Sequence, residues 1–253
     1  MITAKQLSEA YISGANNIEN NRQKVDALNV FPVPDGDTGT NMSMTMGAAR
    51  EELLHNSYTT VGDVAGKAAS ALLRGARGNS GVITSLLFRG FSKGLKHKTE
   101  ACAADLVEAL EIGVAAAYKA VMKPKEGTML TVARMMAEAV TKEANEGANL
   151  YKLIDVMIDE GERALLLTPE LLPVLKEAGV VDSGGKGLVT ILRGFKMVID
   201  GEEVDEYVPA PQQNTAEITG NEEGADLEAL DDIEFGYCTE FFIIHLDESF
   251  SEA

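Results

Sequence analysis

Residues 29–41 read Asn-Val-Phe-Pro-Val-Pro-Asp-Gly-Asp-Thr-Gly-Thr-Asn. The two prolines forbid ordinary helix and the two glycines allow tight turns, so we expect a stiff loop that leads into a helix. Asp35 and Asp37 place two carboxylates on this loop. Alternate carboxylates are hard oxygen ligands suited to Mg²⁺, while the start of the following helix favours an anion. The alternative interpretation is an acidic turn that only caps the helix.

Outward from this loop, the first 200 residues show one helical pattern after another. Apolar residues recur at helical spacing, Thr3 is placed to cap the first helix, and the short breaks contain Gly, Pro or Asn. Short connections favour antiparallel neighbours, so the sequence predicts an all-α bundle. The expected helices are one that carries Leu7, Tyr11 and Ile18, then 42–53, 61–73, 82–95, 101–122, 129–144, 150–167, a short one that Thr168 and Pro169 open and that runs to 178, and 188–199.

The character of the chain changes after the last of these helices. Residues 201–232 combine prolines, glutamines and many acids with few large apolar groups, which is typical of a flexible linker. Residues 237–246 form the one convincing strand pattern, rich in β-branched and aromatic side chains. A single strand is not stable alone. We therefore expect a helical domain over 1–200, an acidic linker over 201–232 and, over 233–253, the first strand of a truncated middle domain.

The net charge of −18 is concentrated after residue 200. Residues 201–253 contain 16 acidic residues and no Lys or Arg, whereas residues 1–200 hold 24 acidic and 22 basic residues. No basic surface is predicted, so a nucleic-acid-binding function is set aside. The acidic segment is interpreted as a solvated spacer, with a docking site for a basic partner surface as the alternative.

Several other classes of site are excluded by what the sequence lacks. Cys102 and Cys238 give no disulfide framework and no CxxC metal site. No apolar run is long enough to span a membrane and the N-terminus does not read as a secretory signal, so we expect a cytoplasmic protein without integral membrane contact. No Walker P-loop or EF-hand pattern fits, and the three histidines lie in polar or terminal contexts that suit no catalytic triad.

Three further turns carry residues that suit an anion or nucleotide site. They are the glycine-rich stretch 74–81, the turn 125–129 and the glycine-rich stretch 181–187. Each alone is more simply a helix cap or a tight turn. All of them fall between helices, as the 29–41 loop does, so alternating helix directions would gather them at one end of the bundle. The side chains and backbone they would present are Asn79, Ser80, Gly81, Thr128, Met129, Asp182, Ser183 and Gly184.

Taken together, residues 30–42, 74–81, 127–129 and 181–187 resemble the dihydroxyacetone-kinase L-subunit-like family. Within it, the chain is most similar to the N-terminal nucleotide-binding domain of bacterial fatty-acid kinase catalytic subunits. The resemblance covers about residues 1–200. It implies an all-α barrel of eight antiparallel helices with ATP or ADP bound at one end.

The resemblance also implies roles for the loop residues. Asp35 and Asp37 would hold two Mg²⁺ ions that bridge the ATP phosphates. The family's third aspartate lies five residues before the first of this pair, where the chain has Val30. With a proline-containing loop one residue longer than the family's, Asn29 takes this place and is the candidate third ligand. The phosphates would contact Thr38, Gly39, Thr40, Asn41, Asn79, Ser80 and Gly81, and the nucleoside pocket would be lined by Thr128, Met129, Asp182, Ser183 and Gly184.

The implied reaction transfers a phosphoryl group from ATP to the carboxylate of a fatty acid. That carboxyl group has a pKa near that of Glu, about 4.3, so it is already ionised at neutral pH and needs no protein base. What the reaction needs is charge neutralisation, which Mg²⁺ supplies. The sequence shows no apolar channel for an acyl chain. The resemblance accordingly implies a separate fatty-acid-binding protein as partner and an acyl-phosphate product for phospholipid synthesis. If the protein forms a homodimer, we expect the contact to lie in further domains.

Two alternative functions stay open at this point. The first is a dihydroxyacetone-type kinase subunit, whose hydroxyl acceptor would make a base or an activating residue more necessary. The second is a non-catalytic module that senses ADP and Mg²⁺ and docks to a partner.

Overall fold

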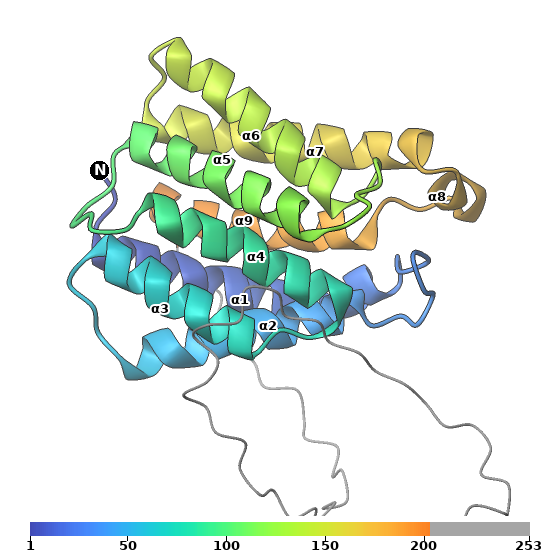
Figure 1. Cartoon of the computed structure of the whole chain (residues 1–253), viewed down its shortest axis with the longest axis horizontal. Helices are drawn as coiled ribbons and strands as arrows, with labels where there is room; N and C mark the ends of the chain where they lie inside the picture. Colours follow the sequence, from blue (N-terminus) through green and yellow to red (C-terminus); the bar gives the residue numbers. More distant parts are fainter. Residues whose placement is uncertain (203–253) are drawn as a thin grey trace, which may run out of the picture. The chain divides into compact units, whose positions relative to one another are not determined.

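The structure is a computed structural model that describes residues 1–202, so the predicted strand at 237–246 and most of the acidic segment lie outside the described residues. Within residues 1–202 the chain is all-α, as predicted, and none of its helices is long and apolar enough to cross a bilayer. The nine helices of this part are α1 (Ala4–Asp26), α2 (Thr38–His55), α3 (Val61–Arg74), α4 (Gly78–Gly94), α5 (Ala103–Ala120), α6 (Met129–Asn145), α7 (Leu150–Leu171), α8 (Pro173–Ala178) and α9 (Ser183–Asp200) (Figure 1).

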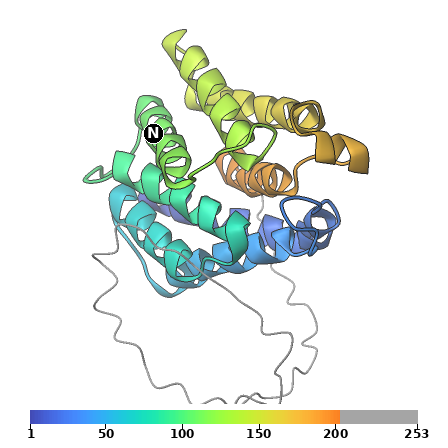
Figure 2. The ribbon, with the colours of Figure 1, turned by 45° about the vertical axis from the view of Figure 1, so that its right-hand side comes forward.

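The eight long helices form a closed ring. Each of α1 to α7 packs against the next in the chain, α7 packs against α9, and α9 returns to pack against α1. The six-residue helix α8 lies in the connection between α7 and α9. Figures 1 and 2 show α1 and α9 side by side, with α4 and α5 on another part of the ring. The eight-helix antiparallel barrel that the family resemblance implies is therefore confirmed, with one short extra helix.

The first helix begins where its capping residue predicts. The Thr3 hydroxyl accepts a hydrogen bond from the Gln6 backbone N–H at 3.3 Å, and the Gln6 side chain accepts from the Thr3 N–H at 3.1 Å. This reciprocal pair satisfies two backbone donors that the helix itself leaves unpaired. Ile2, just before it, pairs with Ala101 in a short antiparallel bridge, so α5 begins at Ala103 and the expected start at 101 is wrong by two residues.

Three helices begin earlier than the sequence predicts. The helix expected from residue 42 starts at Thr38. The helix expected from residue 82 starts at Gly78, and the one expected from 188 starts at Ser183, so both glycine-rich stretches form first turns. Glycine disfavours helix, but here packing overrides that propensity. A Cβ on Gly81 would overlap the Thr45 hydroxyl, and one on Gly187 would overlap the Met42 sulfur. The glycines therefore allow α4 and α9 to approach α2 closely.

The helix boundary predicted at Thr168 and Pro169 is wrong. Helix α7 continues through Pro169 to Leu171, and the short helix α8 has Pro173 as its first residue. Proline lacks the N–H that would bond the carbonyl four residues earlier, which is that of Leu165. The Thr168 hydroxyl donates to this carbonyl at 2.7 Å instead. Thr168 thus compensates for the proline inside α7 and does not cap a new helix.

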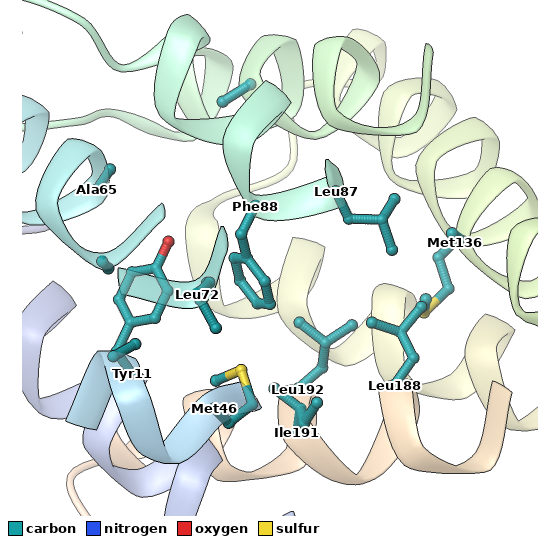
Figure 3. Close-up of a cluster of buried hydrophobic side chains, with 14 of the residues drawn as sticks. Tyr11, Met46, Ala65, Leu72, Leu87, Phe88, Met136, Leu188, Ile191 and Leu192 are labelled. Carbon is teal, nitrogen blue, oxygen red and sulfur yellow. The ribbon is translucent and has the colours of Figure 1, made fainter. Parts of the chain in front are cut away.

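The core of the barrel consists of the Met, Leu and Ala stripes that the sequence predicts. Three aromatic rings, those of Tyr11, Phe88 and Phe195, pack together with centroids 5.0–5.8 Å apart and join α1, α4 and α9. An apolar cavity of about 130 Å³ remains between α1, α4, α5, α6, α7 and α9. Figure 3 shows part of this core, with Tyr11, Met46, Ala65, Leu72, Leu87, Phe88, Met136, Leu188, Ile191 and Leu192 labelled.

Candidate functional site

The four turns singled out in the sequence lie at one end of the barrel. Helices α1, α3, α5 and α7 run toward this end, and α2, α4, α6 and α9 start from it. Figure 1 shows the α1–α2 and α5–α6 connections and α8 on the right-hand side of the view. The end where α2, α4, α6 and α9 start is called the loop end below. The alternation of helix directions, which the sequence predicts from the short connections, brings the turns together.

Direct contacts join these turns. The Ser183 hydroxyl at the start of α9 donates to the Thr38 hydroxyl at the start of α2, at 3.1 Å. The α5–α6 connection meets the acidic loop where Lys125 Nζ lies 5.0 Å from the centroid of the Phe31 ring. A Cβ on Gly78 would overlap the Asn41 amide, so the starts of α4 and α2 also touch.

The acidic loop places its two carboxyl groups against each other. Asp35 Oδ1 accepts a hydrogen bond from Asn29 Nδ2 at 2.6 Å. The pKa of Asp37 is raised, first by partial burial and then by its hydrogen bond with Asp35 and the charges of Asp35 and Asp26, although a hydrogen bond from Asn41 lowers it. The ionised pair is thus electrostatically unfavourable without a counter-charge. A divalent cation beside Asp37 would remove this repulsion.

Asn29 adds an unsatisfied acceptor to the same cluster. Its side chain is buried with 7% of its surface exposed, and its Oδ1 atom has no hydrogen-bond partner. Within residues 1–202 only one other buried side-chain polar atom has no hydrogen-bond partner, the Tyr11 hydroxyl in the core. A buried acceptor of this kind costs free energy unless something binds it. The Asn29 amide is bonded to Asp35 through its nitrogen, and Asn29 is the residue that the family resemblance offers as the third metal ligand.

The donor set fits a cation that keeps other ligands. No group of three or more His, Cys, Asp or Glu side chains in the described part of the chain is arranged to hold a metal ion. Asp35, Asp37 and the Asn29 oxygen together offer an incomplete set of hard oxygen donors. Mg²⁺ is commonly bound in this way, by one or two carboxylates together with waters and substrate phosphates. The residues present therefore fit Mg²⁺ bound together with a polyphosphate.

Asp26, at the end of α1, belongs to the site and was not identified from the sequence. Its two carboxylate oxygens accept hydrogen bonds from the Thr40 backbone N–H at 2.9 Å and from the Thr40 hydroxyl at 2.8 Å. This pairing holds the first turn of α2 against the end of α1 and occupies both polar groups of Thr40. No spacing motif includes Asp26, because its contact is made across 14 residues by the folding of the acidic loop.

We predict that Asp26→Asn destabilises the free protein by about 1–2 kcal/mol, because the two hydrogen bonds from Thr40 lose their charged acceptor. Urea unfolding measures the change. Asp159→Asn, at an exposed position of α7, is the matched control and should change stability by less than about 0.5 kcal/mol. Equal stability of the Asp26 variant and the control would contradict the role assigned to this carboxylate.

The start of α4 lacks the negatively charged partner that the other three helix starts at the loop end have. Asp26 accepts from a backbone N–H of α2, and Asp182 accepts from backbone N–H groups of α9 and α6. Helix α4 has Arg77 as its N-cap residue, with no side-chain cap bond and no acid in its first turn. Its N-terminal N–H groups and dipole therefore favour an added anion most strongly. Asn79 and Ser80 lie in this turn.

The starts of α6 and α9 meet in a buried junction. A Cβ on Gly184 would lie 3.2 Å from Met129 Cβ, so the two turns are in van der Waals contact. Met129, Ser183 and Gly184 are buried, whereas Thr128 is partly exposed. The sequence suggests that Thr128 caps α6, but its hydroxyl donates to the Lys125 carbonyl at 2.8 Å and makes no cap bond. The cap of α6 comes from another turn, through Asp182.

Gly39 has a packing role in addition to any contact with a ligand. A Cβ at this position would overlap the Arg22 carbonyl oxygen, and it would lie 2.9 Å from Val25 Cβ. Only glycine lets the first turn of α2 pass this close to the last turns of α1. The residue expected to contact phosphate is therefore also needed to place the acidic loop.

A model of the DAK2 domain matches residues 32–197. The chain belongs to the DAK2 domain family. Protein YloV of Bacillus subtilis strain 168 is 45% identical over 249 residues, covering 98% of this chain and 45% of that protein. An uncharacterized protein of Staphylococcus haemolyticus, SH1689, is 44% identical over 245 residues, covering 96% of this chain and 44% of its own length. The chain thus spans less than half the length of these relatives.

Solved structures with the same fold include the dihydroxyacetone kinase of C. freundii. Its complex with AMP-PNP and Mg²⁺ has a TM-score of 0.57 to this chain, at 18% identity, and the match covers 76% of this chain and 33% of that one. The native form of the same kinase has a TM-score of 0.54 at 17% identity, with 78% and 35% covered. These likenesses show the fold of the DAK2 domain, and the family membership expected from the sequence motifs is confirmed by the domain match and the relatives.

Proposed function

We propose that this DAK2 domain binds ATP with Mg²⁺ at the loop end and transfers the terminal phosphoryl group to the carboxylate of a fatty acid held by a separate fatty-acid-binding protein. The observation that supports it best is the cluster of Asp35, Asp37 and the unpaired Asn29 oxygen, next to the start of α4, which among the four helix starts at the loop end is the one without an acidic cap. Asn41 connects the acidic cluster to the start of α4, because it hydrogen-bonds Asp37 and touches Gly78.

The residues of the chain have distinct tasks in this proposal. Asp35, Asp37 and the Asn29 oxygen would hold the metal, which supplies positive charge to the phosphate oxygens and to the transition state. The backbone N–H groups at the start of α4, with Asn79 and Ser80, would bind the phosphates as an anion. The junction of α6 and α9 would take the nucleoside, against Met129 and Gly184. The resemblance implies two ions, and the stoichiometry of Mg²⁺ binding would count them.

A carboxylate acceptor suits what the site lacks. Among the described residues, the two histidines lie away from the loop end: His55 is the last residue of α2 and His97 is in the α4–α5 connection. A hydroxyl acceptor would have to be deprotonated, whereas a fatty-acid carboxylate is already ionised at pH 7. The chemistry therefore needs positioning and charge neutralisation, which the site can provide.

Delivery of the acyl chain by another protein suits the interior of the barrel. The apolar cavity of about 130 Å³ is similar in size to an engineered protein cavity that holds benzene. A long acyl chain, with a dozen or more methylene groups, is much larger. Nucleotide binding is supported by a structure with the same fold, the dihydroxyacetone kinase of C. freundii, which contains AMP-PNP and Mg²⁺.

The test combines the protein with ATP, Mg²⁺ and a bacterial fatty-acid-binding protein loaded with acyl chain, and traps acyl-phosphate with hydroxylamine. We expect an acyl-hydroxamate signal that needs ATP, Mg²⁺ and the loaded partner together. Replacing the loaded partner by dihydroxyacetone separates the two kinase alternatives. Turnover of dihydroxyacetone alone, or tight ATP binding without any turnover in the presence of the loaded partner, would contradict the proposed acceptor.

A further inference from the structure

Asp182, which the family resemblance places in the nucleoside pocket, is a buried carboxyl group. Only 5% of its surface is exposed. Its Oδ2 atom accepts a hydrogen bond from the Gly185 backbone N–H at 2.7 Å, which caps α9, and the carboxylate also accepts from the Met129 backbone N–H at the start of α6. One side chain therefore caps two helices that are more than 50 residues apart in the sequence.

The backbone of the same residue reaches a third helix. The Asp182 N–H donates to the Thr168 hydroxyl of α7 at 3.0 Å, and the next residue, Ser183, bonds Thr38 of α2. The side chain and its neighbours thus fix the start of α9 relative to α6, α7 and α2. Gly184, whose Cβ would lie 3.4 Å from Asp182 Oδ2 and 3.2 Å from Met129 Cβ, forms the contact between the two capped turns.

We propose that Asp182 is a positioning residue that locks the starts of α6 and α9 into one rigid wall for the nucleoside. This inference rests on the proposed function, because it assigns the wall to the nucleoside part of ATP. The carboxylate gives both helix starts a negative cap, so it also disfavours a phosphate there. Within residues 1–202 the Asp182 side chain makes no hydrogen bond to the metal and phosphate residues at the starts of α2 and α4. Its neighbour Ser183 bonds Thr38 at the start of α2.

The surroundings of Asp182 make its charge state sensitive to pH. The carboxylate accepts from the Met129 N–H on α6 and the Gly185 N–H on α9, whereas the Thr168 hydroxyl on α7 bonds the Asp182 backbone N–H. No ionisable side chain of residues 1–202 contributes to the shift of the Asp182 pKa. Burial raises the pKa of Asp182 to about 6, with the two N–H groups opposing this shift. Below that pH the neutral form grows, and it accepts hydrogen bonds from the two helix starts more weakly.

The experiment compares Mg²⁺-ATP with Mg²⁺-tripolyphosphate, which carries the phosphates without the nucleoside. In Asp182→Asn, an uncharged amide with one acceptor oxygen replaces the carboxylate and turns an NH₂ donor toward the helix starts. We expect affinity for Mg²⁺-ATP to fall by about tenfold while affinity for Mg²⁺-tripolyphosphate changes by less than about twofold. Asp159→Asn is the matched control and should change neither affinity.

A pH series on the unchanged protein gives a second readout that does not depend on the variant folding. The preference for Mg²⁺-ATP over Mg²⁺-tripolyphosphate should fall between pH 7.5 and 5.5 with a midpoint near 6, and Asp182→Asn, where it folds, should show no such midpoint. The terminal phosphates of both ligands also titrate in this range, so each affinity is corrected for the measured protonation of its own ligand. An unchanged preference over this range, or equal losses for both ligands in Asp182→Asn, would overturn the inference alone. Failure of the unchanged protein to bind either ligand would instead overturn the proposed function.

Discussion

Replacing Asp35 or Asp37 by asparagine is expected to lower the rate of acyl-phosphate formation by about 10²–10³-fold, because each change removes a charged oxygen from the proposed metal site. The amide retains the shape of the side chain but not the charge that holds Mg²⁺. The rate of hydroxamate formation measures the loss, and titration with Mg²⁺ at fixed ATP measures the weaker metal binding.

The stability of the same two variants provides a sharper criterion. The pKa of Asp37 is raised by burial and by the neighbouring carboxylates, so the ionised pair destabilises the metal-free protein. Removing one charge should therefore leave the free energy of unfolding unchanged or slightly higher, in contrast to Asp26→Asn. Asp159→Asn should keep full activity. Full activity in a folded Asp35 or Asp37 variant would contradict the metal assignment.

The second large effect is expected at the crossing of α1 and α9. A Cβ on Gly194 would lie 2.6 Å from both Gly14 Cα and the Ser13 carbonyl oxygen, and these are backbone atoms that cannot rotate away. Gly194→Ala should destabilise the protein by about 2–3 kcal/mol, since the two helices must move apart. The free energy of unfolding in urea measures it.

The matched control for this change is Gly47→Ala, in the interior of α2. A Cβ there has no neighbouring atom within 4 Å, so the substitution only improves helix propensity. It should raise the free energy of unfolding by about 0.5–1 kcal/mol. Similar effects of the two substitutions would show that the α1–α9 contact is looser than the structure has it.

The helices were predictable because their signals are local. The cap at Thr3 and the apolar spacing that follows it lie within a few turns of one another, and both are observed. Glycine-rich helix starts were predicted too late, because the reason for the glycines at 81 and 187 is a neighbouring helix that is distant in sequence. The Thr168 error has the same origin, since the hydroxyl acts on a carbonyl that a proline leaves unpaired.

The candidate site was predictable to a similar extent. The motif around Asp35 and the alternation of helices were enough to expect four turns at one end, and the structure brings them together. Asp26 and the double cap by Asp182 were not predictable, because both depend on contacts between segments that no local pattern records. The unpaired oxygen of Asn29 likewise becomes visible only when its burial is known.

The central claim is that carboxylates of the acidic loop hold a divalent cation against the phosphates of a nucleotide. The most direct measurement is a crystal structure with Mn²⁺ in place of Mg²⁺ and a non-hydrolysable ATP analogue, in which anomalous scattering locates the metal. The account predicts a metal peak in contact with Asp35 and Asp37, and phosphate density at the first turn of α4. A metal peak away from both aspartates, or phosphates bound elsewhere on the barrel, would contradict it.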